Sequence, residues 1–158
     1  MRLFPSLVAA LPLAALAAVV SVSACDSASP VPSGVVTLRK EQGVDFFSGE
    51  VMIPGDYRNS DLVARASGGG LSLTTGGPSP VESRPVNWFL GAGGVEARFE
   101  SLAEVPDERP DAGMTGSNTQ VRAGEGFVTR SADGYWTRGW IQATDGASVT
   151  VAFELIGD

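Results

Sequence analysis

Hydrophobic and polar residues are distributed in two different ways along this chain of 158 residues. From Leu3 to Val22 there is no charged residue, and nearly every side chain is apolar. Beyond residue 34 the apolar residues come in short runs or alternate with polar ones, and glycine, proline or aspartate separates the runs. Alternation with a period of two is typical of half-buried β-strands. The pattern therefore predicts a leader segment followed by a domain built from strands.

The part of the chain after the leader predicts eight to ten short strands. They are expected at residues 35–40, 44–53 (with a bend at 48–49), 60–66, 71–75, 86–90, 95–101, 126–130, 135–143 and 147–156. Turns are expected at 54–55, 68–70, 91–94, 132–134 and 145–146, where glycine or an Asp-Gly pair tolerates a positive φ. The predicted fold class is all-β, a single antiparallel β-sandwich or barrel-like domain of short strands and hairpins.

Two of the expected strands alternate most regularly. In 95–101 the apolar residues share one face and the charged residues share the other, which predicts a half-buried strand. In 147–156 one face carries only large apolar residues and predicts a core strand; these residues are Val149, Val151, Phe153 and Leu155.

Residues 103–120 contain four carboxylates, two prolines and almost no apolar side chain. Such a stretch buries too little surface to offset its ordering entropy, so it predicts a long mobile loop. Asp107, Glu108 and Asp111 could bind calcium, but their spacing matches no EF-hand loop, and a solvated acidic loop is the favoured interpretation.

The leader begins after Arg2 and ends in Val22-Ser23-Ala24-Cys25. A short positive segment followed by an apolar run is the profile of an export signal. The tetrapeptide resembles the lipobox of bacterial lipoproteins, in which an aliphatic residue, two small residues and a cysteine direct lipid attachment and cleavage. The resemblance implies that residues 1–24 are a signal peptide and that Cys25 becomes the lipidated first residue. An uncleaved transmembrane anchor is the alternative, since about 20 apolar residues span a bilayer.

The lipoprotein interpretation places the protein in the cell envelope, anchored to a membrane by acyl chains such as palmitate and facing the periplasm or the cell surface. Cys25 is the only cysteine, so the exported domain has no disulfide and depends on an ordinary core. Residues 25–34 have the composition of a flexible linker, and 35–158 form the domain. Asp26 would favour inner-membrane retention if enterobacterial sorting rules apply.

Charge and residue counts exclude several function classes. The formal charge of −7 becomes more negative when Arg2 leaves with the leader, which disfavours nucleic-acid partners. The chain has no histidine, and its only cysteine is the one expected to be lipidated. These counts exclude zinc sites, haem ligation by imidazole or thiolate, and Ser-His or Cys nucleophiles. Lys40 is the only lysine, and no motif marks a pair of catalytic carboxylates. We therefore expect a protein that is not an enzyme and has no cofactor.

The strand at 135–143 allows two orientations, because Trp136, Arg138 and Trp140 share one face. If this face points inward, the charge of Arg138 is buried or bulged out, at a cost of several kcal/mol when unpaired. If the face points outward, Arg138 stacks between the indole rings, and the ladder forms a platform for a planar ligand, a sugar or a protein partner. The sequence leaves both orientations open.

Residues 124–155 (GEGFVTRSADGYWTRGWIQATDGASVTVAFEL) are similar to the closing hairpins of HmuY-like bacterial lipoproteins. The segments VDFFSGE at 44–50 and SDLVARASGGGLSLTTGG at 60–77 resemble the opening of that family. The resemblance implies a haem-binding β protein. The best-known type ligates iron through two histidines, which this chain lacks, and Ser60 stands where the family's Trp-Asp motif has tryptophan.

If the resemblance extends to haem, Met52 and Met114 are the alternative ligands, since some relatives use methionine. Otherwise Met52 is a core filler and Met114 a loop residue, which is the favoured interpretation. The leading hypothesis is a non-enzymatic, lipid-anchored envelope lipoprotein that binds a ligand or partner through Trp136, Arg138 and Trp140. The alternatives are haem binding without histidine, and a structural envelope component with no small ligand.

Overall fold

Ten strands form two antiparallel sheets in the computed structural model, which describes residues 32–76, 86–110, 114–115, 120–131 and 134–157. Cys25, the leader and most of the expected linker lie outside these residues. The predicted all-β class is confirmed, and the two separate sheets make the domain a sandwich rather than a closed barrel. Within the described segments, no helix has the length and apolar character needed to cross a membrane.

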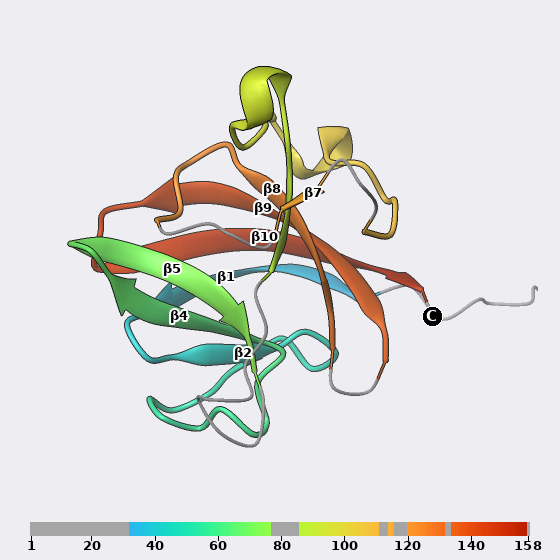
Figure 1. The fold of residues 1–158 in the computed structure, drawn as a ribbon. Coiled ribbons are helices and arrows are strands. Elements are labelled where there is room, and N and C mark those ends of the chain that lie inside the picture. Colours follow the sequence, from blue (N-terminus) through green and yellow to red (C-terminus); the bar gives the residue numbers. More distant parts are fainter. Residues whose placement is uncertain (1–31, 77–85, 111–113, 116–119, 132–133, 158) are drawn as a thin grey trace, which may run out of the picture.

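The larger sheet has the order β1-β10-β9-β8-β6-β7 (Figure 1). Its strands are β1 (Ser33–Arg39), β6 (Asn87–Phe89), β7 (Met114–Thr115), β8 (Gly126–Arg130), β9 (Trp136–Thr144) and β10 (Ser148–Gly157). The smaller sheet has the order β3-β2-β4-β5. Its strands are β2 (Gly43–Asp45), β3 (Glu50–Val51), β4 (Leu62–Ser67) and β5 (Gly70–Thr75). Two short 3₁₀ turns, η1 (Ala92–Gly94) and η2 (Leu102–Glu104), lie between β6 and β7.

The main core lies between the inner faces of the two sheets. All four alternate residues predicted to face the core in the last strand are buried there, which are Val149, Val151, Phe153 and Leu155. Two aromatic pairs fill the centre: Phe46 with Phe153 at 4.8 Å between ring centroids, and Trp88 with Phe127 at 5.3 Å. Since the buried hydrophobic residues of the described chain all lie between Val36 and Leu155, a chain without the leader keeps this core and is expected to fold.

Gly139 shows how closely the inner faces pack. It pairs with Phe127 across β8 and β9. A Cβ at this position would lie 2.1 Å from the Phe127 ring, so only glycine leaves room for the aromatic side chain.

The two ends of the sandwich carry different elements. At one end, which we call the N-terminal end, β1 starts beside the last part of β10, and β9 starts beside the ends of β8 and β10. At the opposite end, the far end, lie the β4–β5 turn and the β9–β10 turn (Figure 1). These two turns approach each other closely, because a Cβ on Gly146 would lie 3.8 Å from the carbonyl oxygen of Gly69.

Several expected strands differ from the structure in extent. β1 begins at Ser33, so Ser33 and Gly34 pair with β10 instead of belonging to the linker. The expected strand at 44–53 is a hairpin of β2 and β3, whose turn at residues 46–49 includes the predicted bend. The Gly68–Gly69 turn of the β4–β5 hairpin is confirmed, with φ of 52° and 96°.

The prediction of a half-buried strand at 95–101 is wrong. This segment makes only isolated bridges, Leu90 with Glu96 and Arg98 with Glu125, and Val95 is 56 % exposed. The alternation was real, since Ala97 and Phe99 are partly buried, but it reflects packing against the outside of a sheet and not membership of one. The hairpin turn expected at 91–94 is confirmed as η1, which leads into the Leu90–Glu96 bridge.

The stretch 103–120, predicted as one long loop, contains ordered elements that the sequence did not predict, while Pro106–Pro110 has no regular structure. Leu102–Glu104 forms a 3₁₀ turn, Val105 is 1 % exposed, and Met114–Thr115 pairs with β6. One buried valine is enough to fix the first part of this polar stretch, because it belongs to a second apolar cluster.

Candidate functional site

The outer face of β9 is covered, so neither orientation expected for its tryptophans describes the structure fully. Thr137, Gly139 and Ile141 are buried on the inner face, and Trp136, Arg138 and Trp140 alternate with them on the outer face. These three outer residues are partly buried and not freely exposed. A second layer of chain therefore lies over this side of the larger sheet.

Residues 95–105, which we call the covering segment, form this second layer. Phe89, Val105 and Val128 are the buried centre of a separate apolar cluster. Other hydrophobic residues pack around this centre; they are Ala97, Phe99, Met114, Trp136, Trp140 and Ile156. The covering segment thus gives the outer face a small core of its own.

Backbone hydrogen bonds and one close approach hold the covering segment in place. The amide of Ala97 donates to the carbonyl of Phe89 at 2.8 Å, and the amide of Phe99 donates to Gly124 at 2.7 Å. The Phe99 ring lies over Gly126, where a Cβ would be only 2.7 Å away. Trp140 completes the attachment, since its Nε1 donates to the carbonyl oxygen of Phe99 at 3.0 Å.

Arg138 keeps its charge paired at the edge of this cluster. Its Nε donates to Glu154 Oε2 at 2.9 Å, and its Nη2 forms an ion pair with the same oxygen. Its Nη1 donates to the carbonyl oxygen of Val105 at 2.7 Å. The guanidinium is therefore used to join β9 to β10 and to the covering segment. The cation–π contact at this sheet is made instead by Arg130, whose guanidinium carbon lies 5.8 Å from the centroid of the Trp136 ring.

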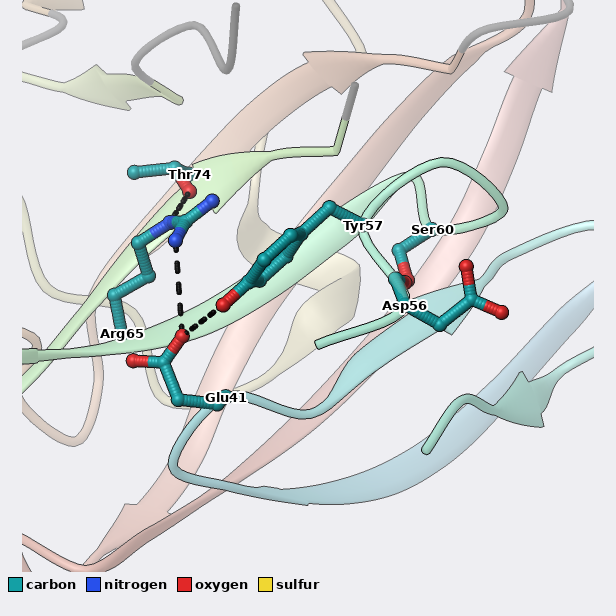
Figure 2. A network of polar contacts seen from close by, with 6 residues as sticks. All are labelled: Glu41, Asp56, Tyr57, Ser60, Arg65 and Thr74. Carbon is teal, nitrogen blue, oxygen red and sulfur yellow. Dashed lines mark hydrogen bonds and ion pairs between the residues drawn. The ribbon is translucent and has the colours of Figure 1, made fainter. Parts of the chain in front are cut away.

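A polar cluster occupies the outer face of the smaller sheet (Figure 2). Its members are Glu41 after β1, Tyr57 in the β3–β4 connection, Arg65 in β4 and Thr74 in β5. The Tyr57 hydroxyl donates to Glu41 Oε2, and Arg65 Nη1 lies 3.6 Å from the same oxygen. Arg65 Nε donates to Thr74 Oγ1 at 3.2 Å, and its guanidinium carbon lies 4.2 Å from the centre of the Tyr57 ring.

The electrostatics of this polar cluster favour a neutral phenol. The hydrogen bond to the Glu41 carboxylate raises the pKa of Tyr57 above its ordinary value, and partial desolvation and the Glu41 charge act in the same direction. Ser60, buried on the neighbouring turn, donates from Oγ to the carbonyl of Asp56 at 2.7 Å and helps to position Tyr57. These contacts tie the β1–β2 turn and the β3–β4 connection to the sheet, which is a structural role.

An open hollow of about 590 Å³ lies at the far end of the sandwich. The β4–β5 turn, the β9–β10 turn, the covering segment and residues 120–123 line it. Two of the lining residues are the exposed arginines Arg98 and Arg122, and neither takes part in the two ion pairs of the described chain. Asp145 is the acidic residue among those that line the hollow.

The walls of the hollow are fixed by backbone contacts. The amide of Val121 donates to the carbonyl of Leu71 at 2.8 Å, which extends the edge of β5. The buried carboxylate of Glu125 accepts a hydrogen bond from the amide of Arg122 at 2.9 Å. In the β9–β10 turn, Asp145 accepts from the amides of Ser148 and Ala147, and these hydrogen bonds lower its pKa. The hollow is therefore pre-formed, and two cationic side chains line it.

The two methionines lie at edge strands of different sheets. Met52 follows edge strand β3 of the smaller sheet, and its amide donates to Gly43 at 2.8 Å. Met114 belongs to β7 at the edge of the larger sheet, where it packs on the outer cluster and is not the loop residue that was expected. Joint haem ligation by Met52 and Met114 stays a prediction, which the appearance of a Soret band on haem addition would test.

The acidic residues of the expected loop form no metal site in the part of the chain that is described. Asp107 and Glu108 are exposed there, and Asp111 lies outside it. Groups of three or more potential metal ligands are absent among the described residues.

The described geometry defines a small antiparallel β-sandwich with covered outer faces and one arginine-lined hollow. Comparison of the chain with models of protein families, with curated proteins and with solved structures gave no match.

Sequence reasoning missed Arg98 and Arg122 as a pair. Arg98 appeared only as the polar side of an expected strand, and Arg122 follows a polar stretch without any motif. They come together because the covering segment bridges to Glu125 through Arg98. The available signal was their scarcity, since the chain has 11 basic residues against 18 acidic ones, which makes any pair of uncommitted arginines notable.

Proposed function

We propose that this chain is a non-enzymatic, lipid-anchored lipoprotein of the bacterial cell envelope, and that its sandwich binds an anionic ligand or partner in the hollow at the far end. The anchor rests on the Val22-Ser23-Ala24-Cys25 sequence at the end of the uncharged run. The binding proposal rests on a single structural observation: Arg98 and Arg122 line the same pre-formed hollow.

The chemistry of the hollow favours an anion. Guanidinium groups bind carboxylate, phosphate and sulfate oxygens through paired N–H donors. Both arginines are exposed and belong to neither ion pair of the described chain, so a ligand need not displace a salt bridge. The formal charge of the chain is −7, so this pair of arginines would also orient an anionic partner as it approaches.

The predicted site residues then act through the covering segment. Trp140 and Arg138 hydrogen-bond to Phe99 and Val105, which belong to the same segment as Arg98. Their contribution to binding is to position Arg98, while Trp136 packs in the outer cluster beside Arg130, at the N-terminal end of the same face.

Titration with inorganic phosphate, citrate or heparin, followed by the amide chemical shifts in NMR spectra, would test the binding proposal. We expect saturable shifts at Gly69, Ala123 and Gly146, which line the hollow. The double variant Arg98→Gln/Arg122→Gln should abolish them, and Arg58→Gln, which removes an exposed arginine from the β3–β4 connection, should leave them unchanged. Equal loss in both variants, or no shifts with all three anions, would overturn the anionic-ligand proposal.

Detergent partitioning would test the anchor. The full chain produced in a bacterium with a lipoprotein pathway should enter the detergent phase. Cys25→Ser should move the protein to the aqueous phase or leave it unprocessed, whereas Ser23→Ala, which keeps a small residue before the cysteine, should behave as the unaltered chain does. Detergent partitioning of processed Cys25→Ser would contradict a lipid anchor.

A further inference from the structure

Exposed apolar side chains gather at the N-terminal end of the sandwich. Three of the large hydrophobic residues that the described structure leaves exposed lie here: Phe47 is 61 % exposed, Val35 59 % and Tyr135 36 %. The rings of Phe47 and Tyr135 stack at 6.1 Å between centroids. Val35 and Phe47 both line a hollow of about 200 Å³ at the start of β1. We call this continuous surface the Phe47 surface.

The turn that carries Phe47 is built to hold this ring outward. Asp45 Oδ1 accepts a hydrogen bond from the Phe47 amide at 2.8 Å, and Asp45 Oδ2 accepts one from Ser48 Oγ at 2.8 Å. Gly49 closes the turn with a φ of 71°. The amide of Phe46, the preceding residue, donates to buried Asp61 at 2.9 Å while its side chain enters the core. The turn thus fixes the exposed Phe47 ring beside Val35 and Tyr135, and an exposed apolar patch of this kind marks an interaction surface.

The length of chain before β1 identifies the partner of this surface. Pro32, the first described residue, is the seventh residue after Cys25. A fully extended chain gains at most about 3.6 Å per residue, so the start of β1 stays within about 25 Å of an anchor at Cys25. The Phe47 surface lies at the same end of the sandwich as this start. Any lipid attached to Cys25 therefore holds this surface close to the headgroups.

We propose that the Phe47 surface is the face that rests on the lipid bilayer when Cys25 anchors the chain; this inference rests on the proposed lipid anchor. Tyrosine and other aromatic side chains settle at the membrane interface, where their rings meet both apolar and polar groups. A short tether raises the effective concentration to the millimolar range, so a weak affinity is enough to set the orientation. The Arg98–Arg122 hollow, at the far end, then points away from the bilayer and is open to its ligand.

Tryptophan reporters in a tethered protein would test this orientation independently of biological lipidation. Residues 25–158 contain the entire described core, and the Cys25 thiol can be coupled to a maleimide phospholipid in vesicles of phosphatidylcholine with brominated acyl chains. The variants are Phe47→Trp and two matched controls, Ile53→Trp and Val95→Trp. Both control positions are exposed, at 73 % and 56 %, and lie away from the N-terminal end.

We expect the emission added by Phe47→Trp to shift to shorter wavelength and to be quenched by the brominated lipid, and the emission added by the two controls to remain as in water. Equal quenching at all three positions, or none at Phe47→Trp with coupling confirmed by mass, would overturn the orientation. The failure of the anchor proposal is distinguishable, because it would appear as an unmodified Cys25 in protein from cells, whatever the tethered vesicles show.

Discussion

The outer faces of the two sheets are both covered, but by opposite means. The covering segment lies on the larger sheet through an apolar cluster with Arg138 at its edge. The β3–β4 connection lies on the smaller sheet through the polar contacts of Glu41, Tyr57 and Arg65. The two arginine side chains are equally exposed, at 19 % and 18 %. Two arginines of equal exposure therefore serve different contacts. Apolar packing holds the covering segment, which we call the apolar cover, and polar contacts hold the β3–β4 connection, which we call the polar cover.

Removing Trp140 should break the apolar cover and have the largest effect. Trp140→Ala takes an indole out of the outer cluster and deletes the hydrogen bond to Phe99. We expect a loss of about 3 kcal/mol in the free energy of unfolding, measured by chemical denaturation. The amides of Ala97 and Phe99 should also exchange faster. Val95→Ala, in the same segment but exposed, is the control; an equal loss there would show that the cluster does not hold the cover.

Exchanging each arginine for methionine compares the two covers directly. Arg138→Met leaves Glu154 and the carbonyl of Val105 without their guanidinium donor and should cost about 1–2 kcal/mol of unfolding free energy. Arg65→Met removes a longer ion pair and a cation–π contact and should cost about 0.5–1 kcal/mol. The reverse order of the two losses would mean that the polar cover carries more stability than its geometry indicates.

Raising the pH should loosen only the polar cover. The pKa of Tyr57 is raised in the folded chain, so the neutral phenol is the form that the fold favours. Its contribution is complete below the ordinary tyrosine pKa of about 10 and disappears as the pH rises through the higher folded value. The stability difference between the unaltered chain and Tyr57→Phe should therefore shrink in alkaline solution. If the stability difference between the unaltered chain and Tyr135→Phe shrinks in the same way, the cause is general destabilisation at alkaline pH and not the Tyr57 hydrogen bond.

The sequence predicted the strands in which alternate residues face the main core. It did not predict the segments whose apolar residues pack on the outer face of the larger sheet. The inward face of β10 followed directly from its period of two. The same period at 95–101 was misleading, because Ala97 and Phe99 face the outside of the larger sheet. Val105 gave no signal at all, since a single valine in a polar stretch has no periodicity.

The partners of the site residues could not be predicted, because they are distant in sequence and depend on register. Arg138 meets Glu154 only because β9 and β10 pair at these positions. Arg65 meets Tyr57 through the course of the β3–β4 connection, for which the chain offers no motif. The sequence did identify Arg138 as the residue that needed an explanation, since a charge between two tryptophans had to be paired or exposed.

The central claim, a β-sandwich held to a membrane by its first mature residue, is tested most directly by the mass of the N-terminal peptide of the protein isolated from a bacterium that lipidates its exported proteins. The account predicts a peptide that begins at Cys25 and carries the added mass of acyl chains. A peptide that begins at Met1, or one with a free Cys25 thiol, would contradict it.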